Sequence, residues 1–141
     1  MKNPQAEKQL KAYQAQITEN EVKNQLIDYL RAIGWLVLRI NSGARTETDS
    51  QTGQRRHYKF CTWQARGYAP SSAGVSDILA IEPGGRLWAI ECKRPGKLAN
   101  LTQSQRDFQE AVRERGGVAI VADSQGVLIE AIIKYGGRFG A

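Results

Sequence analysis

Three charged residues interrupt two apolar stretches of this sequence. Asp77 lies within VSDILAI at 75–81, and Glu91 and Lys93 lie within LWAIECK at 87–93. Charged side chains are rarely buried without partners, so charges in core strands cost free energy unless they take part in chemistry. Two carboxylates can hold Mg²⁺ near a scissile phosphate, while a lysine orients the attacking water or stabilises the developing negative charge. The three residues are therefore candidates for the catalytic centre of a phosphodiesterase.

The turn between the two stretches decides whether Asp77 and Glu91 can meet. A three-residue loop at 83–85 would place them opposite each other on one face of a hairpin, about 5 Å apart. A two-residue loop would place Asp77 opposite Cys92, on the other face, unless a bulge intervenes. The proposed chemistry therefore predicts the longer loop or a nearby bulge.

The Glu-x-Lys spacing by itself is weak information, because it occurs twice in the chain. The second copy, Glu21-Val22-Lys23, is expected on the polar side of a helix and outside the site. An Asp on one hairpin strand combined with Glu-x-Lys at the end of the other is more specific. The alternative interpretation is a set of ordinary ion pairs at strand ends.

Two further polar residues are candidates for the same site. Glu19 precedes Val22 by three residues and Leu26 by seven, so it shares the core-facing stripe of its helix. It could be an accessory metal ligand, or it could simply complement the helix dipole. Gln105 could cap its own helix, or it could point toward the site and hold a phosphate or a water. Both alternatives stay open for each residue.

The elements that must position these residues follow from apolar periodicity and from capping signals. Capping boxes at Thr18–Glu21 and Thr102–Gln105 mark the starts of two helices. Helices are predicted at 18–33, 102–115 and 127–133, and strands at 35–40, 58–63, 75–81, 87–93 and 118–122. The strand at 35–40 is expected to be largely buried. This order predicts an α/β fold, with a mixed sheet flanked by helices.

The domain organisation is expected to be simple. A single domain is predicted over 18–135, preceded by a polar extension at 1–17 that is solvated or contacts a partner. The tail at 136–141 is expected to be loose. A long basic insert at 44–73 interrupts the domain, and its strand is expected to form a hairpin through a turn around 49–53.

The charge balance favours a polyanionic partner. The 141 residues carry a net charge of +6, which favours nucleic acid above all, although a merely solubilising surface is the alternative. Basic residues of the insert could grip phosphates while its aromatic residues stack on bases, or the aromatics could simply anchor the insert's hairpin. The candidates for DNA contact are Arg39, Asn41, Arg45, Arg55, Arg56, Lys59, Arg66, Arg94 and Lys97.

Other function classes find no support in the sequence. Cys61, Cys92 and the single histidine, His57, lack the spacing of a zinc site. The N-terminal segment is polar, unlike a signal peptide, and no apolar run is long enough to cross a membrane. We therefore expect a protein of the reducing cytoplasm, without a membrane partner.

Five segments carry a resemblance to a known family. They are TENEV (18–22), LRINSG (38–43), GVSD (74–77), IECK (90–93) and LT-x-x-Q (101–105). In this order they resemble VRR-NUC domains, the virus-type replication-repair nucleases of the PD-(D/E)xK superfamily. The resemblance covers roughly residues 18–122 but does not explain the insert. Ser76 stands where the family signature often has proline, which is not a ligand.

The resemblance implies a restriction-endonuclease-like αβββαβ core and a specific site. Asp77, Glu91 and Lys93 would be catalytic, and Gln105 matches the family's glutamine. Glu19, Asp77, Glu91 and the backbone carbonyl of Cys92 would hold Mg²⁺, for which Mn²⁺ could substitute.

The resemblance also implies a biological role. The expected activity is a DNA endonuclease selective for branched DNA such as Holliday junctions, in replication, recombination or repair. Short stand-alone members resemble phage-type proteins, which act in the host cytoplasm, and the resemblance suggests a homodimer. The alternative function is a non-catalytic DNA-binding subunit that keeps the nuclease fold.

Overall fold

A mixed sheet of four strands forms the centre of the molecule, in the order β1-β4-β5-β6. The strands are β1 (Leu36–Arg39), β4 (Ile78–Ile81), β5 (Leu87–Cys92) and β6 (Val118–Ala122). The first three pair antiparallel, whereas β6 runs parallel to β5. The structure, a computed structural model, describes residues 3–40, 44–59 and 61–140, and for 44–45 and 57–59 it describes the backbone only.

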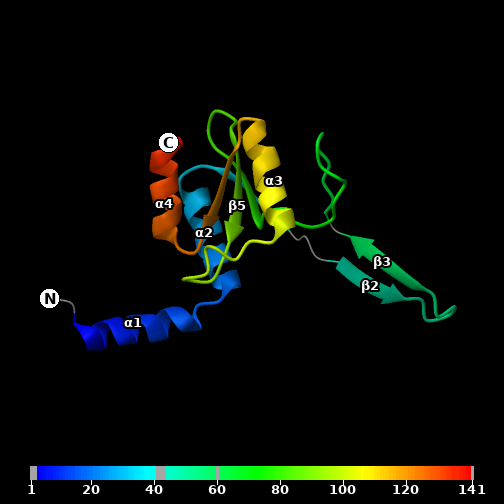
Figure 1. Cartoon of the computed structure of the whole chain (residues 1–141), viewed down its shortest axis with the longest axis horizontal. Helices are drawn as coiled ribbons and strands as arrows, with labels where there is room; N and C mark the ends of the chain where they lie inside the picture. Colours follow the sequence, from blue (N-terminus) through cyan, green and yellow to red (C-terminus); the bar gives the residue numbers. More distant parts are fainter. Residues whose placement is uncertain (1–2, 41–43, 60, 141) are drawn as a thin grey trace.

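Helices cover both faces of this sheet (Figure 1). One face packs against α2 (Glu19–Ala32) and α4 (Gln125–Lys134), and the other packs against α3 (Gln103–Glu114). The arrangement confirms the predicted mixed α/β class. No helix in the described part of the chain is both long and apolar enough to cross a bilayer.

The core follows from the alternation of side chains along the strands. Ile78, Trp88 and Ile90 point to one face, where Leu26 and Leu128 from the two helices meet them, all five fully buried. On the other face, a smaller cluster joins Ala89 and Ala119 to Val112 of α3, with Phe108 and Leu87 packed against it. The sheet is thus anchored on both sides.

The hairpin between β4 and β5 has the register that the proposed chemistry requires. The Glu82 amide donates to the Arg86 carbonyl at 3.1 Å, which encloses the three-residue loop Pro83–Gly85. Both loop glycines have positive φ angles, 104° and 98°, which side chains disfavour. Continuing the observed register by one pair places Asp77 opposite Glu91.

The helix starts and the last strand lie close to where local signals predict them. Both capping boxes form, Thr18 with Glu21 and Thr102 with Gln105. The strand predicted at 118–122 is β6 itself. The final helix begins two residues before the predicted start at Val127 and is capped by Ser124.

The prediction that the first strand is largely buried is wrong. β1 is an edge strand of the sheet, and its one partner among the described strands is β4. Leu36 and Leu38 are 58% and 47% exposed. An apolar run does not distinguish an edge strand from a central one, because that depends on which strands pair.

The insert forms a separate two-stranded hairpin. Its strands are β2 (Ala44–Thr48) and β3 (Arg55–Lys59), and the hairpin projects away from the sheet (Figure 1). The turn around 49–53 is where it was predicted, but the strand predicted at 58–63 is displaced toward the N-terminus. Polar strands such as these lack the apolar alternation on which the prediction depends.

The N-terminal extension is a helix, α1 (Pro4–Gln16), which lies outside the body of the domain (Figure 1). Asn3 caps it by accepting from the amides of Gln5 and Ala6. None of its residues is buried. Both predicted roles, a solvated extension and an arm that contacts a partner, stay predictions.

The tail is not loose, contrary to prediction. The Arg138 amide donates to Glu82 Oε2 at 2.6 Å, and the Arg138 carbonyl accepts from the indole of Trp35 at 2.7 Å. The Gly140 amide also donates to the Ile33 carbonyl at 2.7 Å. Buried polar groups need partners, and the backbone of the tail supplies them.

Candidate active site

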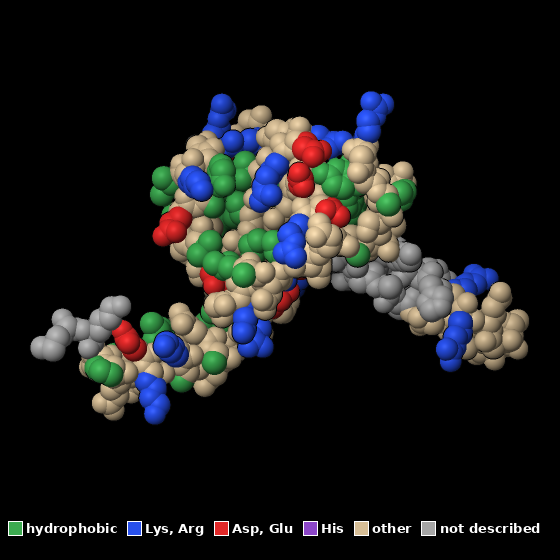
Figure 2. Space-filling model, in the orientation of Figure 1, with side chains coloured by type: hydrophobic (Ala, Val, Ile, Leu, Met, Phe, Trp, Pro, Cys, Tyr) green, Lys and Arg blue, Asp and Glu red, His purple; other side chains and the backbone are tan. Residues whose placement is uncertain are grey.

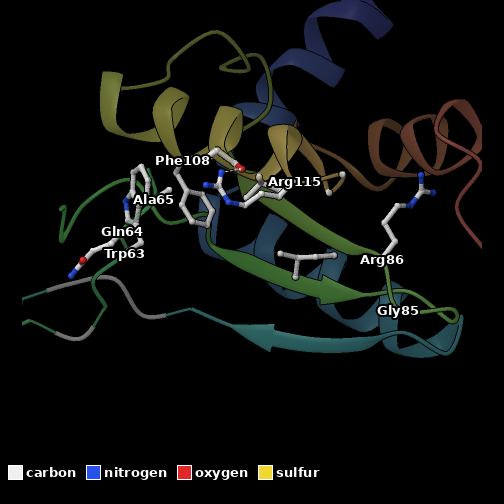
Figure 3. A pocket seen from close by; sticks show the side chains of 12 residues that line it. Trp63, Gln64, Ala65, Gly85, Arg86, Phe108 and Arg115 are labelled. Atoms are coloured by element: carbon white, nitrogen blue, oxygen red, sulfur yellow. Dashed lines mark hydrogen bonds between the residues drawn. The ribbon is translucent and has the colours of Figure 1, made fainter. Parts of the chain in front are cut away.

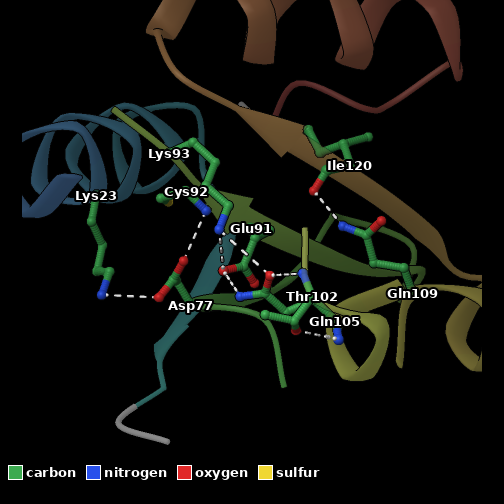
Figure 4. Close-up of polar contacts among 9 residues, drawn as sticks. All are labelled: Lys23, Asp77, Glu91, Cys92, Lys93, Thr102, Gln105, Gln109 and Ile120. Carbon is green, nitrogen blue, oxygen red and sulfur yellow. Dashed lines mark hydrogen bonds and ion pairs between the residues drawn. The ribbon is translucent and has the colours of Figure 1, made fainter. Parts of the chain in front are cut away.

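Four predicted site residues converge at one end of the central hairpin (Figure 4). Asp77 immediately precedes β4, Glu91 lies on β5, and Lys93 immediately follows β5. Gln105 lies in the first turn of α3. The structure thus brings together residues from the hairpin and from the helix that covers it.

Glu91 is the most buried of these residues, at 3% exposed. Its Oε1 accepts from Gln105 Nε2 at 2.8 Å, whereas its Oε2 is buried without a hydrogen-bond partner among the described residues. Burial and the adjacent carboxylate of Asp77 raise the pKa of Glu91 to about 8, although Lys93 opposes the shift. Lys93 is therefore too weak a counter-ion to offset burial and the neighbouring carboxylate.

Asp77 is better satisfied than Glu91. Its Oδ2 accepts from the Cys92 amide at 2.8 Å, and its Oδ1 forms an ion pair with Lys23 Nζ at 3.1 Å. The bond to Cys92 ties the Asp77 carboxylate to the end of the neighbouring strand. The hairpin consequently sets the orientation of the Asp77 carboxylate toward Glu91.

Lys93 lies beside Glu91 without being held tightly. Its Nζ is 3.9 Å from Glu91 Oε1 and 3.5 Å from Gln105 Oε1, both long for charge-assisted contacts. The Lys93 side chain is 13% exposed. Its ammonium group can therefore reach a substrate without first breaking a strong bond.

Gln105 fulfils two structural roles that the sequence left as alternatives. Its Oε1 accepts from the Thr102 amide at 2.9 Å, which completes the capping box. Its Nε2 donates to Glu91, so the same amide group also points toward the site. Contact with a phosphate or a water stays a prediction.

Glu19 borders the site at the start of α2. It is half-buried, and its charge helps to raise the pKa of Glu91, after burial and Asp77 as the larger causes. A hollow of about 430 Å³ beside the site is lined by Glu19, Lys93, Arg94, Lys97 and Asn100. The structure therefore places two of the predicted DNA-contacting cations next to the catalytic candidates.

Lys23 is a site residue that sequence reasoning missed. The second Glu-x-Lys copy was expected on the polar side of α2, and Glu21 does lie there, exposed and capping its helix. Lys23 instead turns toward Asp77 (Figure 4). The signal was present, because Lys23 follows Glu19 by four residues and so lies one turn along the same side of the helix.

The other predicted DNA-contacting residues are scattered. Arg39 bonds to the side chains of Asn20 and Asn24 on α2. Arg55 and Arg56 are exposed on the projecting hairpin, and Arg66 is exposed in the loop that follows it. Figure 2 shows basic side chains on both projecting segments and on the body. Outside the described residues lie Asn41 and the side chains of Arg45 and Lys59.

Two aromatic residues of the insert anchor it to the domain. The ring centroid of Trp63 lies 5.6 Å from that of Tyr68 and 5.5 Å from that of Phe108 on α3. The Tyr68 hydroxyl donates to Glu114 at 2.9 Å. Trp63 and Phe108 also border a largely apolar hollow of about 370 Å³ (Figure 3). Trp63 and Tyr68 thus anchor the loop after the β2–β3 hairpin to α3, and not the hairpin itself as the alternative expected.

The donor set suits a hard divalent cation only in part. Among the residues that the structure describes, no three His, Cys, Asp or Glu side chains are grouped closely enough to hold a metal ion. Asp77 and Glu91 face each other, and the unsatisfied oxygen of Glu91 is of the type that Mg²⁺ prefers. Glu19 and a backbone carbonyl would have to complete such a site.

Comparison of the chain with protein-family models, with curated proteins and with solved structures finds no match. The resemblance noted in the sequence therefore rests on its motifs alone. A functional interpretation depends on the geometry of the site.

Proposed function

We propose that the protein is a metal-dependent DNA endonuclease with its active site at Asp77, Glu91 and Lys93. The observation that carries this proposal is the buried Oε2 of Glu91, which has no hydrogen-bond partner within the described part of the chain and lies next to a second carboxylate. Such an arrangement costs free energy in a merely structural hairpin, because two facing carboxylates repel each other. A bound cation would remove that cost.

The residues that would hold the cation supply oxygen donors. They are Asp77, Glu91, Glu19 and the backbone carbonyl of Cys92, a set suited to Mg²⁺ with Mn²⁺ as a substitute. When bound, the ion supplies Lewis acidity, which lowers the pKa of water and neutralises charge on the scissile phosphate.

Lys93 and Gln105 have separate roles in this proposal. The ammonium group of Lys93 stabilises negative charge on the phosphate, because it lies beside Glu91 without a short bond of its own. Gln105 positions Glu91 through its amide nitrogen and fixes that orientation to the start of α3. Preorganisation of this kind reduces the rearrangement needed during the reaction.

The order of the elements supports a nuclease core. Apart from the inserted hairpin β2–β3, helix α2 is followed by β1, β4, β5, α3 and β6, which corresponds to the αβββαβ order of restriction-endonuclease-like folds. We infer that the chain is a VRR-NUC-like enzyme of this class.

DNA binding is proposed to use two surfaces. Arg94 and Lys97 beside the site would hold phosphates near the scissile bond. The β2–β3 hairpin would contact DNA through Arg55 and Arg56, since a two-stranded ribbon fits the major groove. The net charge of +6 favours such a partner.

The preferred substrate is proposed to be branched DNA, such as a four-way junction, cut by a homodimer in the cytoplasm. The motif resemblance supports this choice. A two-fold dimer would present two symmetric sites. Paired symmetric nicks at the junction, together with a dimer in light scattering, would support it, whereas a monomer that cuts only flaps would exclude it.

A nicking assay tests the activity itself. Supercoiled plasmid and junction DNA would be incubated with Mg²⁺ or Mn²⁺ and the wild type, Asp77→Asn, Lys93→Met or the control Lys11→Met. Lys11 is exposed on α1, away from the site. We expect the control to cut like wild type and the two site variants to lose at least about 100-fold in rate.

The alternative function makes a different prediction in the same assay. If the protein is a non-catalytic DNA-binding subunit, the wild-type protein would bind the junction but would not cut it with either metal. Equal cutting by wild type and both site variants would also reject the catalytic assignment.

A further inference from the structure

Lys23 forms an ion pair with a residue of the proposed metal site. Its Nζ lies 3.1 Å from Asp77 Oδ1, and the two side chains are only 17% and 16% exposed. A contact this short and this shielded is not a solvated surface pair. The Asp77 oxygen that a cation would need is therefore already engaged.

The pair is held in place from both sides. Val22 and Leu26, the neighbours of Lys23 along the inner side of α2, are fully buried in the core. The other Asp77 oxygen accepts from the Cys92 amide. Helix and hairpin thus fix the ammonium group and the carboxylate against each other.

The two facing carboxylates differ in consequence. Asp77 is satisfied at both oxygens, by Lys23 and by Cys92, whereas Oε2 of Glu91 finds no partner in the residues that the structure describes. Lys23 therefore neutralises the Asp77 carboxylate, which lies next to the acidic side chain of Glu91. The ion pair between Lys23 and Asp77 stabilises the metal-free fold but opposes binding of a divalent metal ion.

We propose that Lys23 is an internal counter-ion that occupies Asp77 in the metal-free protein and must release it when a divalent cation binds. The inference rests on the proposed function, since it concerns the same metal site. Lys23 lowers the affinity for metal through competition for Asp77 and through charge repulsion. Once released, its ammonium group stays at the site as a cation for the substrate phosphate.

Removal of the ammonium group should therefore tighten metal binding. Lys23→Met keeps the apolar stem of the side chain and removes only the charge. For a partly shielded pair we expect the Kd for Mn²⁺ to fall about tenfold. Lys23→Gln serves as a second neutral variant, Lys23→Arg keeps the charge, and Lys11→Met on α1 controls for net charge.

The test is calorimetric titration of each protein with MnCl₂ in the absence of DNA, so that activity is not the readout. Circular dichroism would first establish that each variant is folded. Lys23→Met and Lys23→Gln are expected to bind Mn²⁺ more tightly than wild type, while Lys23→Arg and Lys11→Met stay close to wild type. Equal or weaker binding by both neutral variants overturns the proposal.

A double variant separates the ion pair from a general effect of charge. In an Asp77→Asn background, Lys23→Gln should change the thermal midpoint of the metal-free protein little, because its partner charge is gone. In the wild-type background the same change should lower that midpoint by several degrees. Equal shifts in both backgrounds would show that Lys23 does not act through Asp77 and would overturn the proposal.

The outcomes also distinguish this inference from the proposed function. If wild type binds Mn²⁺ and the neutral variants bind no more tightly, only the role of Lys23 fails. If wild type, Lys23→Met and Lys23→Gln all fail to bind Mn²⁺ at millimolar concentration, the metal site fails and the inference fails with it.

Discussion

The side chain of Gln105 links the start of α3 to the buried carboxylate of Glu91. Its Nε2 donates to Glu91 Oε1 at 2.8 Å, while its Oε1 accepts from the Thr102 amide at 2.9 Å. One amide group thus completes a helix cap and orients a candidate catalytic residue. Changes at Gln105 should therefore affect stability and activity together.

Gln105→Ala tests this double role. We expect a loss of about 1–3 kcal/mol in the free energy of unfolding, because the cap is weakened and Glu91 loses a donor. The nicking rate should also fall, since Glu91 is no longer oriented. Urea denaturation and plasmid nicking would measure the two effects. Gln103→Ala, at an exposed position of the same helix turn, should change neither strongly, and an equal effect there would contradict the prediction.

Glu91→Gln should increase the stability of the metal-free protein at neutral pH. Burial and Asp77 raise the pKa of Glu91 to about 8 in the folded state, so folding at neutral pH must take up a proton at this group, and a glutamine removes that cost. The gain should be about 1 kcal/mol or more in urea denaturation with EDTA present. The same variant should not nick DNA. A loss of stability would show that Glu91 is a structural residue.

Glu82 is a second buried carboxylate, and its role is structural. It accepts from the Arg138 amide, from the Trp88 indole and from Arg86. Glu82→Gln should lower the free energy of unfolding by about 3 kcal/mol at neutral pH, because a buried charged network is broken. Urea denaturation would measure the loss. Glu130→Gln, at an exposed position on α4, is the control and should change stability little.

The stability that Glu82 contributes should depend on pH. Burial alone would raise the pKa of Glu82, but the bonds from Arg138, Arg86 and Trp88 outweigh it and hold the pKa below the usual 4.5. Because the pKa is lower in the folded state, the contribution is present above pH 4.5 and is lost as the pH falls through the folded value. The difference between wild type and Glu82→Gln should therefore shrink in acid. A difference that grows in acid would contradict this assignment.

The projecting hairpin should contribute to DNA affinity without contributing to chemistry. Arg55→Ala with Arg56→Ala should weaken junction binding about tenfold at low salt and reduce the salt slope by about 2. Fluorescence anisotropy over a range of salt concentrations would measure both. Lys8→Ala with Lys11→Ala on α1 removes the same number of positive charges and should weaken junction binding less. Equal losses in the two variants would indicate a response to net charge alone.

Local signals in the sequence were enough to predict much of the site. The turn at 83–85 allowed two registers, and the proposed chemistry selected the three-residue loop that the structure contains, which aligns Asp77 with Glu91. The capping residues Thr18 and Thr102 place the starts of two helices, because hydrogen bonds within four residues decide them. The α/β class follows from the order of these elements.

Only the tertiary structure decided which distant groups meet. Lys23 pairs with Asp77 because α2 packs across the end of the hairpin, and the periodicity of one helix does not reveal its neighbours. Likewise, the tail is held by Glu82 and Trp35, although its glycine-rich sequence suggested a loose segment. β1 is an edge strand because of strand pairing, which depends on the whole sheet. Local hydrogen bonds and turn geometry are encoded over a few residues, whereas burial and ion pairing depend on contacts between segments that only the folded chain brings together.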